Sequence, residues 1–151
     1  MSHVHELSYD DCAMLLRAGV FGRMVLSRPT GPEIVPVNYT VAGDAVLVRT
    51  APGTLLDRYA GGAHLVFEVD DVNYERWHGW SVVARGVGER LCADDLTDDE
   101  QRSPRPPHWV TREEESWLRL RWITLTGRRL GHGWSPAAEM PVLRSGTRTG
   151  G

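Results

Sequence analysis

The sequence predicts a mainly β protein in which six antiparallel strands form a small barrel, accompanied by a few short α-helices. Three observations lead to this fold class. Beyond residue 20, apolar and polar side chains alternate in short runs that glycine and proline interrupt, which is typical of β-strands. Only three short helical segments accompany these runs. A six-stranded sheet has unpaired edges unless it closes, so a barrel is the simplest arrangement.

The chain of 151 residues is long enough for one such domain. The domain begins with a helix, because Ser8 can cap its free amides while Asp10 and Asp11 complement its positive end. Apolar residues at helical spacing continue to about Ala18, where glycine follows. The segments expected are a flexible N-terminal tail at 1–7, the folded domain at 8–133 and a C-terminal tail at 134–151.

The remaining elements follow in order along the chain. Residues 28–32 and 42–44 have the composition of hairpin turns, so the sheet is mostly antiparallel. Two further helices are predicted, one at 55–60 that Thr54 caps and one near 94–101. The predicted strands are 22–27, 33–41, 45–50, 64–69, 81–91 and 118–126.

Charge and composition exclude several classes of function. The formal net charge of −3 gives no basic excess for a nucleic acid, and no apolar run approaches the length of a membrane span. Cys12 and Cys92 match no metal-binding or disulfide pattern, and no secretory signal opens the chain, so we expect a cytoplasmic protein without a metal site. All 17 basic residues are arginines, so an anion site must use guanidinium groups or backbone amides.

The stretch VLVRTAPGTLLDRY, residues 46–59, suggests an anion site. A strand ends at Arg49 and Thr50, a Pro-Gly turn follows, and Thr54 begins a helix whose amides point back toward the strand end. Helix amides, a hydroxyl and an arginine are common ligands of phosphate or carboxylate groups. An ordinary strand-turn-helix connection explains the same residues, and spacing alone favours it.

Two other stretches leave similar alternatives open. Pro36 indicates an edge strand or a bulge, after which Asn38 and Tyr39 either face a ligand or belong to a twisted edge. Trp77 and Trp80 bracket the entrance of a later strand, where indoles either stack on a planar ring or pack in the core.

Taken together, several segments resemble one known family, the pyridoxamine 5′-phosphate oxidase-like split β-barrels that bind flavin, and in particular its small actinobacterial branch. The resemblance covers about residues 6–131 and implies a split barrel, a homodimer, and FMN in a groove between the subunits. The segments are GVFGRMVL at 19–26, IVPVNYTVAGDAVLVRTAPGTLLD at 34–57, VFEVDDVN at 66–73, GWSVVARGVGE at 79–89 and LRLRWITLTGRRL at 118–130.

The resemblance also assigns roles to residues of this chain. It implies that Arg49, Thr50 and Thr54 hold the flavin phosphate. The residues that it places near the isoalloxazine ring are Pro36, Val37, Asn38, Tyr39, Trp80, Ser81 and Val82.

Two departures from the family pattern limit what can be carried over. Leu55 stands where relatives commonly have a lysine, which weakens the phosphate site unless Arg58, one turn later, substitutes. Arg128, Arg129 and His132 do not reproduce the basic residues with which pyridoxamine phosphate oxidases grip their substrate, so we do not expect a vitamin B6 enzyme.

The resulting hypothesis is an FMN-dependent oxidoreductase of unknown substrate, in which the flavin supplies the redox chemistry. Tyr39 or Ser81 could donate a hydrogen bond to the ring or the substrate. The alternative is a non-catalytic dimer that binds or senses flavin, and F420 or haem are alternative cofactors.

Overall fold

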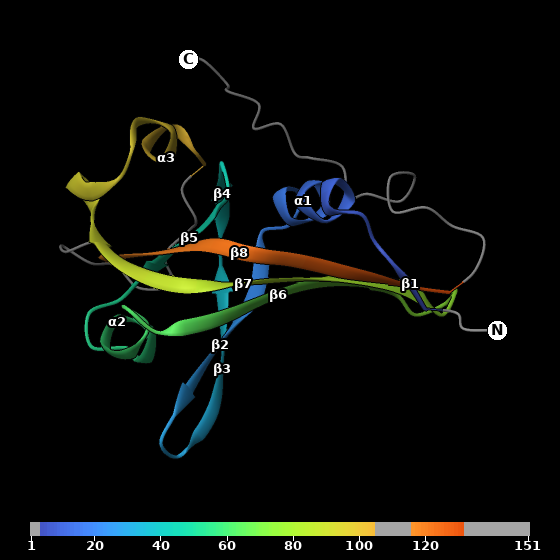
Figure 1. Ribbon diagram of the computed structural model, residues 1–151, viewed down its shortest axis with the longest axis horizontal. Coiled ribbons are helices and arrows are strands. Elements are labelled where there is room, and N and C mark those ends of the chain that lie inside the picture. Colours follow the sequence, from blue (N-terminus) through green and yellow to red (C-terminus); the bar gives the residue numbers. More distant parts are fainter. Residues whose placement is uncertain (1–3, 105–115, 132–151) are drawn as a thin grey trace.

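The computed structural model describes residues 4–104 and 116–131, and these residues form one antiparallel sheet with short helices around it (Figure 1). The sheet order is β3-β2-β6-β7-β8-β5-β4, and β1 pairs with β8 outside this path. The predicted mainly β, antiparallel fold class is confirmed. The strands are β1 (Val4–Glu6), β2 (Phe21–Arg28), β3 (Gly31–Asn38), β4 (Thr40–Ala42), β5 (Ala45–Thr50), β6 (His64–Asn73), β7 (His78–Cys92) and β8 (Ser116–Leu130). The helices are α1 (Tyr9–Ala18), α2 (Leu55–Tyr59), the 3₁₀ turn η1 (Ala93–Asp95) and α3 (Asp98–Arg102).

One extended segment brings the two edges of the sheet together. β3 and β4 are the edge strands, yet only Tyr39 separates them along the chain. β3 pairs with β2 whereas β4 pairs with β5, so the chain changes partner at Tyr39. The hydroxyl of this buried tyrosine donates to the carbonyl of Leu16 in α1, and its ring meets Phe67 edge-on with centroids 4.7 Å apart. These contacts hold Tyr39, where the chain changes its pairing partner, against the core.

Helix α1 packs on the core face of the curved sheet. It is capped as predicted, because Ser8 Oγ accepts from Asp11 N at 3.2 Å. Its buried side chains, among them Cys12 and Leu16, join the main hydrophobic core. Gly127 of β8 lies beneath the helix, and a Cβ atom there would come within 2.7 Å of Cys12 Sγ. The absence of a side chain at this glycine therefore allows the close approach of helix and strand.

The N-terminal segment differs from the predicted flexible tail. Residues 4–6, expected within a flexible tail, form β1 and pair with residues 128–130 of β8. Backbone pairing at a free strand edge requires no apolar pattern, so no periodic signal marks this strand in the sequence. Residues 105–115 and 132–151 lie outside the described residues, and with them the predicted C-terminal tail at 134–151.

The central hairpin is longer than predicted. β6 continues to Asn73 and β7 starts at His78, whereas apolar alternation had indicated strands at 64–69 and 81–91. The acidic pair Asp70 and Asp71 breaks the alternation at the end of β6 although the backbone stays paired. The helix expected near 94–101 is divided into η1 and α3.

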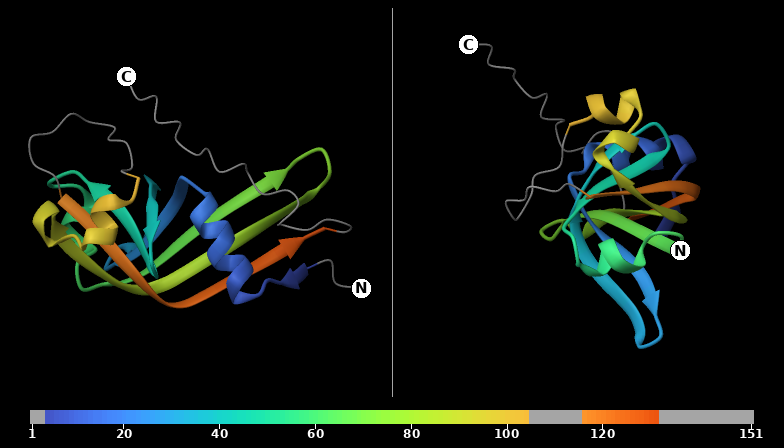
Figure 2. Two further views of the ribbon diagram at one scale, coloured as in Figure 1. Left: turned by 90° about the horizontal axis from the view of Figure 1, so that it is seen from above. Right: turned by 90° about the vertical axis from the view of Figure 1, so that its left-hand side faces the viewer.

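The long strands give the molecule two well-separated ends. Figure 1 shows α2 and α3 at one end and the β6–β7 hairpin with β1 at the other, and Figure 2 confirms this separation from above. Within the described residues, the longest helix is α1 with 10 residues, and none has the length and apolar character of a membrane span.

Candidate functional site

The turn between β5 and α2 is the first part of the candidate site. Gly53 has a positive φ of 80°, which lets the chain reverse directly after Thr50. Thr54 stands at the N-cap position, but its hydroxyl donates to Ala51 O at 2.7 Å and makes no capping hydrogen bond. The predicted side-chain cap at Thr54 is therefore wrong. Asp57 takes over this function, since its Oδ2 accepts from Gly53 N at 2.8 Å.

Asp57 is the centre of a polar network that ties this turn to the sheet. Its buried Oδ1 accepts from Ser116 Oγ at 3.1 Å and lies 2.9 Å from Arg90 Nε. Burial raises the pKa of this carboxyl, but the hydrogen bonds from Gly53 and Ser116 and the charge of Arg90 together hold the pKa below its usual range. The turn thus already contains an anion, the carboxylate of the chain itself.

Two of the predicted site residues carry buried polar atoms that the fold leaves without a partner. The hydroxyl of Thr50 and the side-chain nitrogen of Asn38 are both buried and have no hydrogen-bond partner among the described residues. Arg49, next to Thr50, stacks its guanidinium over the Trp117 ring at 5.5 Å. Buried polar groups are normally paired, so the Thr50 and Asn38 atoms mark places where a ligand can bind.

The remaining predicted residues of this region have different environments. Pro36 lies on the outer face of an edge strand, as predicted, whereas Val37 is buried in the core. Burial raises the pKa of Tyr39, and its hydroxyl is already engaged by Leu16, so it is not placed to donate to a ring or substrate. Arg58 is exposed on α2.

The second part of the candidate site lies at the far end of β7. Trp80 is 5% exposed and Val82 is fully buried, and both belong to the main core, as the core-packing alternative predicted for Trp80. Ser81 faces outward between them. It borders a cavity of about 330 Å³, which we call the hairpin pocket. The lining of the hairpin pocket includes Val72, Tyr74, Trp77, Trp80, Ser81 and Leu130.

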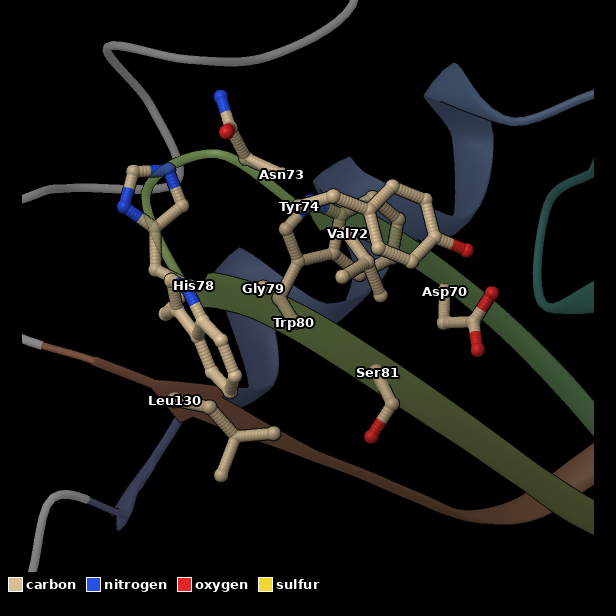
Figure 3. A pocket seen from close by; sticks show the side chains of 10 residues that line it. Asp70, Val72, Asn73, Tyr74, His78, Gly79, Trp80, Ser81 and Leu130 are labelled. Atoms are coloured by element: carbon tan, nitrogen blue, oxygen red, sulfur yellow. The ribbon is translucent and has the colours of Figure 1, made fainter.

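The hairpin pocket has mostly apolar walls and a few polar groups. Figure 3 shows Asp70 and Ser81 on neighbouring strands at one end, and Asn73 and His78 near the turn at the other. Two of its aromatic side chains, Trp77 and Tyr74, are 88% and 86% exposed. Sequence analysis singled out Trp77 but not Tyr74, whose single position in a loop carries no periodic signal.

The two parts of the site are far apart within one chain. Arg49 pairs with Trp117 at the beginning of β8, whereas Trp80 pairs with Arg129 near its end. The intervening residues span on the order of 40 Å of strand. One flavin cannot contact both parts within a single subunit.

Comparison with known families places residues 8–129 in the family described as pyridoxamine 5′-phosphate oxidase. The chain belongs to this family. Its match to the family covers most of the domain and includes both parts of the candidate site.

Individual relatives agree with this membership. The chain is 33% identical over 132 residues to the uncharacterized protein Rv0080 of Mycobacterium tuberculosis, covering 84% of this chain and 86% of that protein. It is similar to the structure of the FAD-binding protein from Mycobacterium smegmatis, with 34% identity, a TM-score of 0.75, and coverage of 85% of this chain and 100% of that one. The FAD and haem binding protein from the same organism, at 18% identity and a TM-score of 0.63, covers 88% of this chain and 75% of its own and shares the fold. The split-barrel fold implied by the sequence is therefore confirmed.

No group of three or more histidine, cysteine, aspartate or glutamate residues within 4–104 and 116–131 is arranged to hold a metal ion.

Sequence reasoning missed two polar partners of Asp57, Arg90 and Ser116. Both are far from Asp57 along the chain and carry no local signal.

Proposed function

We propose that the protein is a homodimeric flavoprotein that binds FMN, or the FMN half of a larger flavin, and acts as an oxidoreductase. The observation that carries this proposal is the pair of buried, unpartnered polar atoms on Asn38 and Thr50. They belong to the two segments that the family resemblance assigns to the ring and to the phosphate. The M. smegmatis relative, at 34% identity, is an FAD-binding protein, and FAD contains FMN as one half.

The residues present fit a flavin in the following way. Thr50 Oγ would donate to a phosphate oxygen, and Arg49 beside it would supply a positive charge. The Asn38 amide would donate to a carbonyl group of the ring system. When bound, the flavin would supply hydride transfer, which no side chain of this chain can perform.

Separation of the two parts of the site supports a dimer. Since Trp80–Val82 lie at the opposite end of β8 from Arg49 and Thr50, both sets can surround one ligand only if they come from different subunits. An antiparallel arrangement of two copies would bring the hairpin of one next to the β5–α2 turn of the other, and the symmetry would create two equal sites.

Thr50→Val tests the proposal most sharply, because valine keeps the shape and removes only the hydroxyl. Without ligand, the variant should be more stable than the parent by about 1 kcal/mol, since a buried unpaired hydroxyl is lost. Its affinity for FMN should fall about tenfold. Titrations of FMN fluorescence and urea unfolding would measure both effects.

Arg49→Ala should also weaken FMN, whereas Arg102→Ala on the exposed face of α3 is a matched control that should not. Unchanged FMN affinity in both Thr50→Val and Arg49→Ala would refute the proposed phosphate site. Mass spectrometry of the small molecule released from the denatured protein would distinguish FMN, FAD, F420 and haem.

A second function, reversible binding or sensing of flavin without catalysis, is favoured by the contacts of the turn. Leu55 replaces the common lysine, which removes a cationic donor, and Asp57 already accepts from the amide of Gly53, so fewer hydrogen-bond donors remain for a phosphate. Stopped-flow reduction of the loaded protein by NADH, NADPH or reduced F420 separates the two functions. A bound flavin that none of these donors reduces supports the non-catalytic one.

A further inference from the structure

The arginine that binds Asp57 carries donors that the fold does not use. Arg90 of β7 approaches Asp57 Oδ1 with its Nε at 2.9 Å. Its side chain is 58% exposed, whereas that of Asp57 is only 6% exposed. The two terminal nitrogens of Arg90 form no hydrogen bond or ion pair with any described residue. Since a guanidinium group has five N–H donors, most of them remain available beside the β5–α2 turn.

Arg119 of β8 shows that one guanidinium can serve two anions in this fold. Its Nη2 lies 3.0 Å from Glu89 Oε2, and its Nη1 donates to Oε1 of the buried Glu100 at 2.6 Å. Arg90 directly follows Glu89 on β7 and therefore lies on the opposite face of the sheet, where it contacts one carboxylate of the described chain. Its terminal nitrogens have the capacity for a second anion that no described residue supplies.

Strand register places Arg90 on the face that carries the unpartnered hydroxyl of Thr50. Thr50 pairs with Ser116 of β8, and Arg90 pairs with Leu118, two positions further along the same strand. Because alternate residues of a strand share a face, Thr50 and Arg90 lie on the same side of the sheet. The side-chain contacts agree with this register, since Ser116 Oγ and Arg90 Nε both meet Asp57 Oδ1.

Two other arginines near the turn are placed differently. Arg49 pairs with Trp117 and stacks over its ring on the other face of β5, so it would approach a phosphate at Thr50 around the strand end. Arg58 is exposed on α2 and directly follows Asp57. Successive helical residues point about 100° apart around the axis, so Arg58 points away from the side of the helix that carries the carboxylate. Arg90 is the arginine that the Asp57 network holds beside Thr50.

Contacts at both ends of α2 fix Arg90 relative to the turn. At the N-terminal end, the carboxylate of Asp57 that binds Arg90 also accepts from Gly53 N at 2.8 Å. After the helix, Gly62 N donates to a carbonyl of β7 at 2.8 Å. A Cβ atom at Gly61 would lie 3.3 Å from Arg90 Cβ, so this glycine allows the chain to pack closely on β7. The guanidinium group is therefore held in place before any ligand arrives.

We propose that Arg90 binds a phosphate group beside Thr50, with Asp57 as the positioning residue that holds its Nε and directs the terminal nitrogens to the ligand. The proposal rests on the function proposed above, in which this phosphate belongs to FMN. Arginine suits the task because its planar fork can bind a carboxylate along one edge and phosphate oxygens along another. These donors would offset those that Leu55 and the amide of Gly53 do not supply.

Titration of the full chain with FMN and riboflavin tests this role. Arg90→Gln should weaken FMN about tenfold and leave riboflavin, which lacks the phosphate, unchanged. Arg90→Lys should fall between the parent and Arg90→Gln, because a single ammonium group must serve both Asp57 and the phosphate. A purely structural role of Arg90 would instead weaken FMN and riboflavin alike, and this result would overturn the proposal.

Arg121→Gln is the matched control, because Arg121 of β8 is 54% exposed and likewise contacts one carboxylate, that of Glu89 at 3.9 Å. Arg58→Gln tests the rival cation on α2. Urea unfolding shows whether each variant is folded, and Arg90→Lys repeats the comparison if the glutamine variant is not. Equal FMN affinity in the parent and the folded Arg90 variant would overturn the proposal. A loss of FMN affinity in Arg58→Gln that Arg90→Gln does not share would also overturn it.

Inorganic phosphate separates failure of this inference from failure of the proposed function. At constant ionic strength, phosphate should raise the midpoint of thermal unfolding of the parent but not of Arg90→Gln, whether or not flavin binds. If Thr50→Val weakens FMN and Arg90→Gln does not, the flavin function stands and the role of Arg90 fails. If no flavin binds but phosphate stabilises the parent through Arg90, the flavin function fails and the anion site stands. A parent that binds neither FMN nor phosphate refutes both.

Discussion

The two ends of the molecule deal with their polar and aromatic groups in opposite ways. At the β5–α2 turn, Asp57 is buried and receives donors from Gly53, Ser116 and Arg90. At the hairpin end, the side chains of Trp77 and Tyr74 are almost fully exposed. The nearby Arg85 and Arg128 form no ion pair with any described residue. The polar groups of the turn are largely hydrogen-bonded within the fold, apart from isolated atoms such as Thr50 Oγ. The aromatic side chains of the hairpin end are instead exposed on the surface.

This contrast shows that a sequence pattern typical of an anion site can serve the fold. The stretch at 46–59 does surround an anion, but the nearest one is the carboxylate of Asp57. The phosphate site that we propose would therefore depend on donors that this network does not engage, chiefly the hydroxyl of Thr50. Substitutions at the two ends should separate structural from ligand-binding roles.

The largest effect on stability is expected at the hairpin end, from a residue that belongs to the core. Trp80→Ala should lower the free energy of unfolding by about 3–5 kcal/mol, because the indole is only 5% exposed and its removal leaves a cavity in the core. Trp77→Ala, only three positions away, should change stability by less than about 0.5 kcal/mol, since that side chain is exposed. Urea unfolding of both variants measures the difference, and similar losses in the two would contradict the distinction between the buried Trp80 and the exposed Trp77.

At the other end, Asp57→Ala should cost about 2–3 kcal/mol, because several donors, including the buried hydroxyl of Ser116, lose a charged acceptor. The exposed Asp71 on β6 is a suitable control, and Asp71→Ala should be nearly neutral. Denaturant unfolding at neutral pH would compare the two variants. A neutral Asp57→Ala would mean that the network does not hold the turn.

The same carboxylate should make stability depend on acid. Since the folded protein lowers the pKa of Asp57, its contribution is fully present above the unfolded pKa of about 3.9 and is lost as pH falls through the folded pKa. Asp57→Asn should lack this part of the acid dependence, so the difference in stability between parent and variant should shrink below about pH 4. Unfolding curves from pH 7 to pH 2.5 check this expectation, and a constant difference would contradict it.

The smallest expected effect concerns the backbone of the hairpin loop. Trp77→Gly should relieve the positive φ of 54° and raise stability by up to about 1 kcal/mol relative to Trp77→Ala. Thermal unfolding of the two variants is sufficient to detect the difference. A glycine variant that is no more stable than the alanine variant would indicate that the loop is not strained at this position.

Elements with a strong local pattern were predicted well. Helix α1 and its Ser8 cap follow from local capping chemistry, and the edge position of Pro36 follows from its missing amide hydrogen. The short strand β1 and the extension of β6 past Asp70 were missed, because backbone pairing stabilises them without apolar alternation. β4 was predicted only as the end of one strand at 33–41, which the structure divides at Tyr39.

The candidate site was predicted less completely for a related reason. Residue types and family resemblance predicted the segments around Asn38, Thr50 and Ser81 as candidates. Whether a polar group is free or engaged could not, because partners such as Leu16 for Tyr39 come from distant parts of the chain.

By itself, the sequence determined the strand-rich class and the restriction of cationic groups to arginine, since both depend on composition and local order, and it indicated the family through five segments that resemble it. Only the tertiary structure decided that Asp57 caps the β5–α2 turn, that Trp80 packs inside while Trp77 is exposed, and that the two parts of the site lie at opposite ends of β8. The physical reason is that burial and hydrogen-bond partners depend on strand register, which joins residues far apart in the chain.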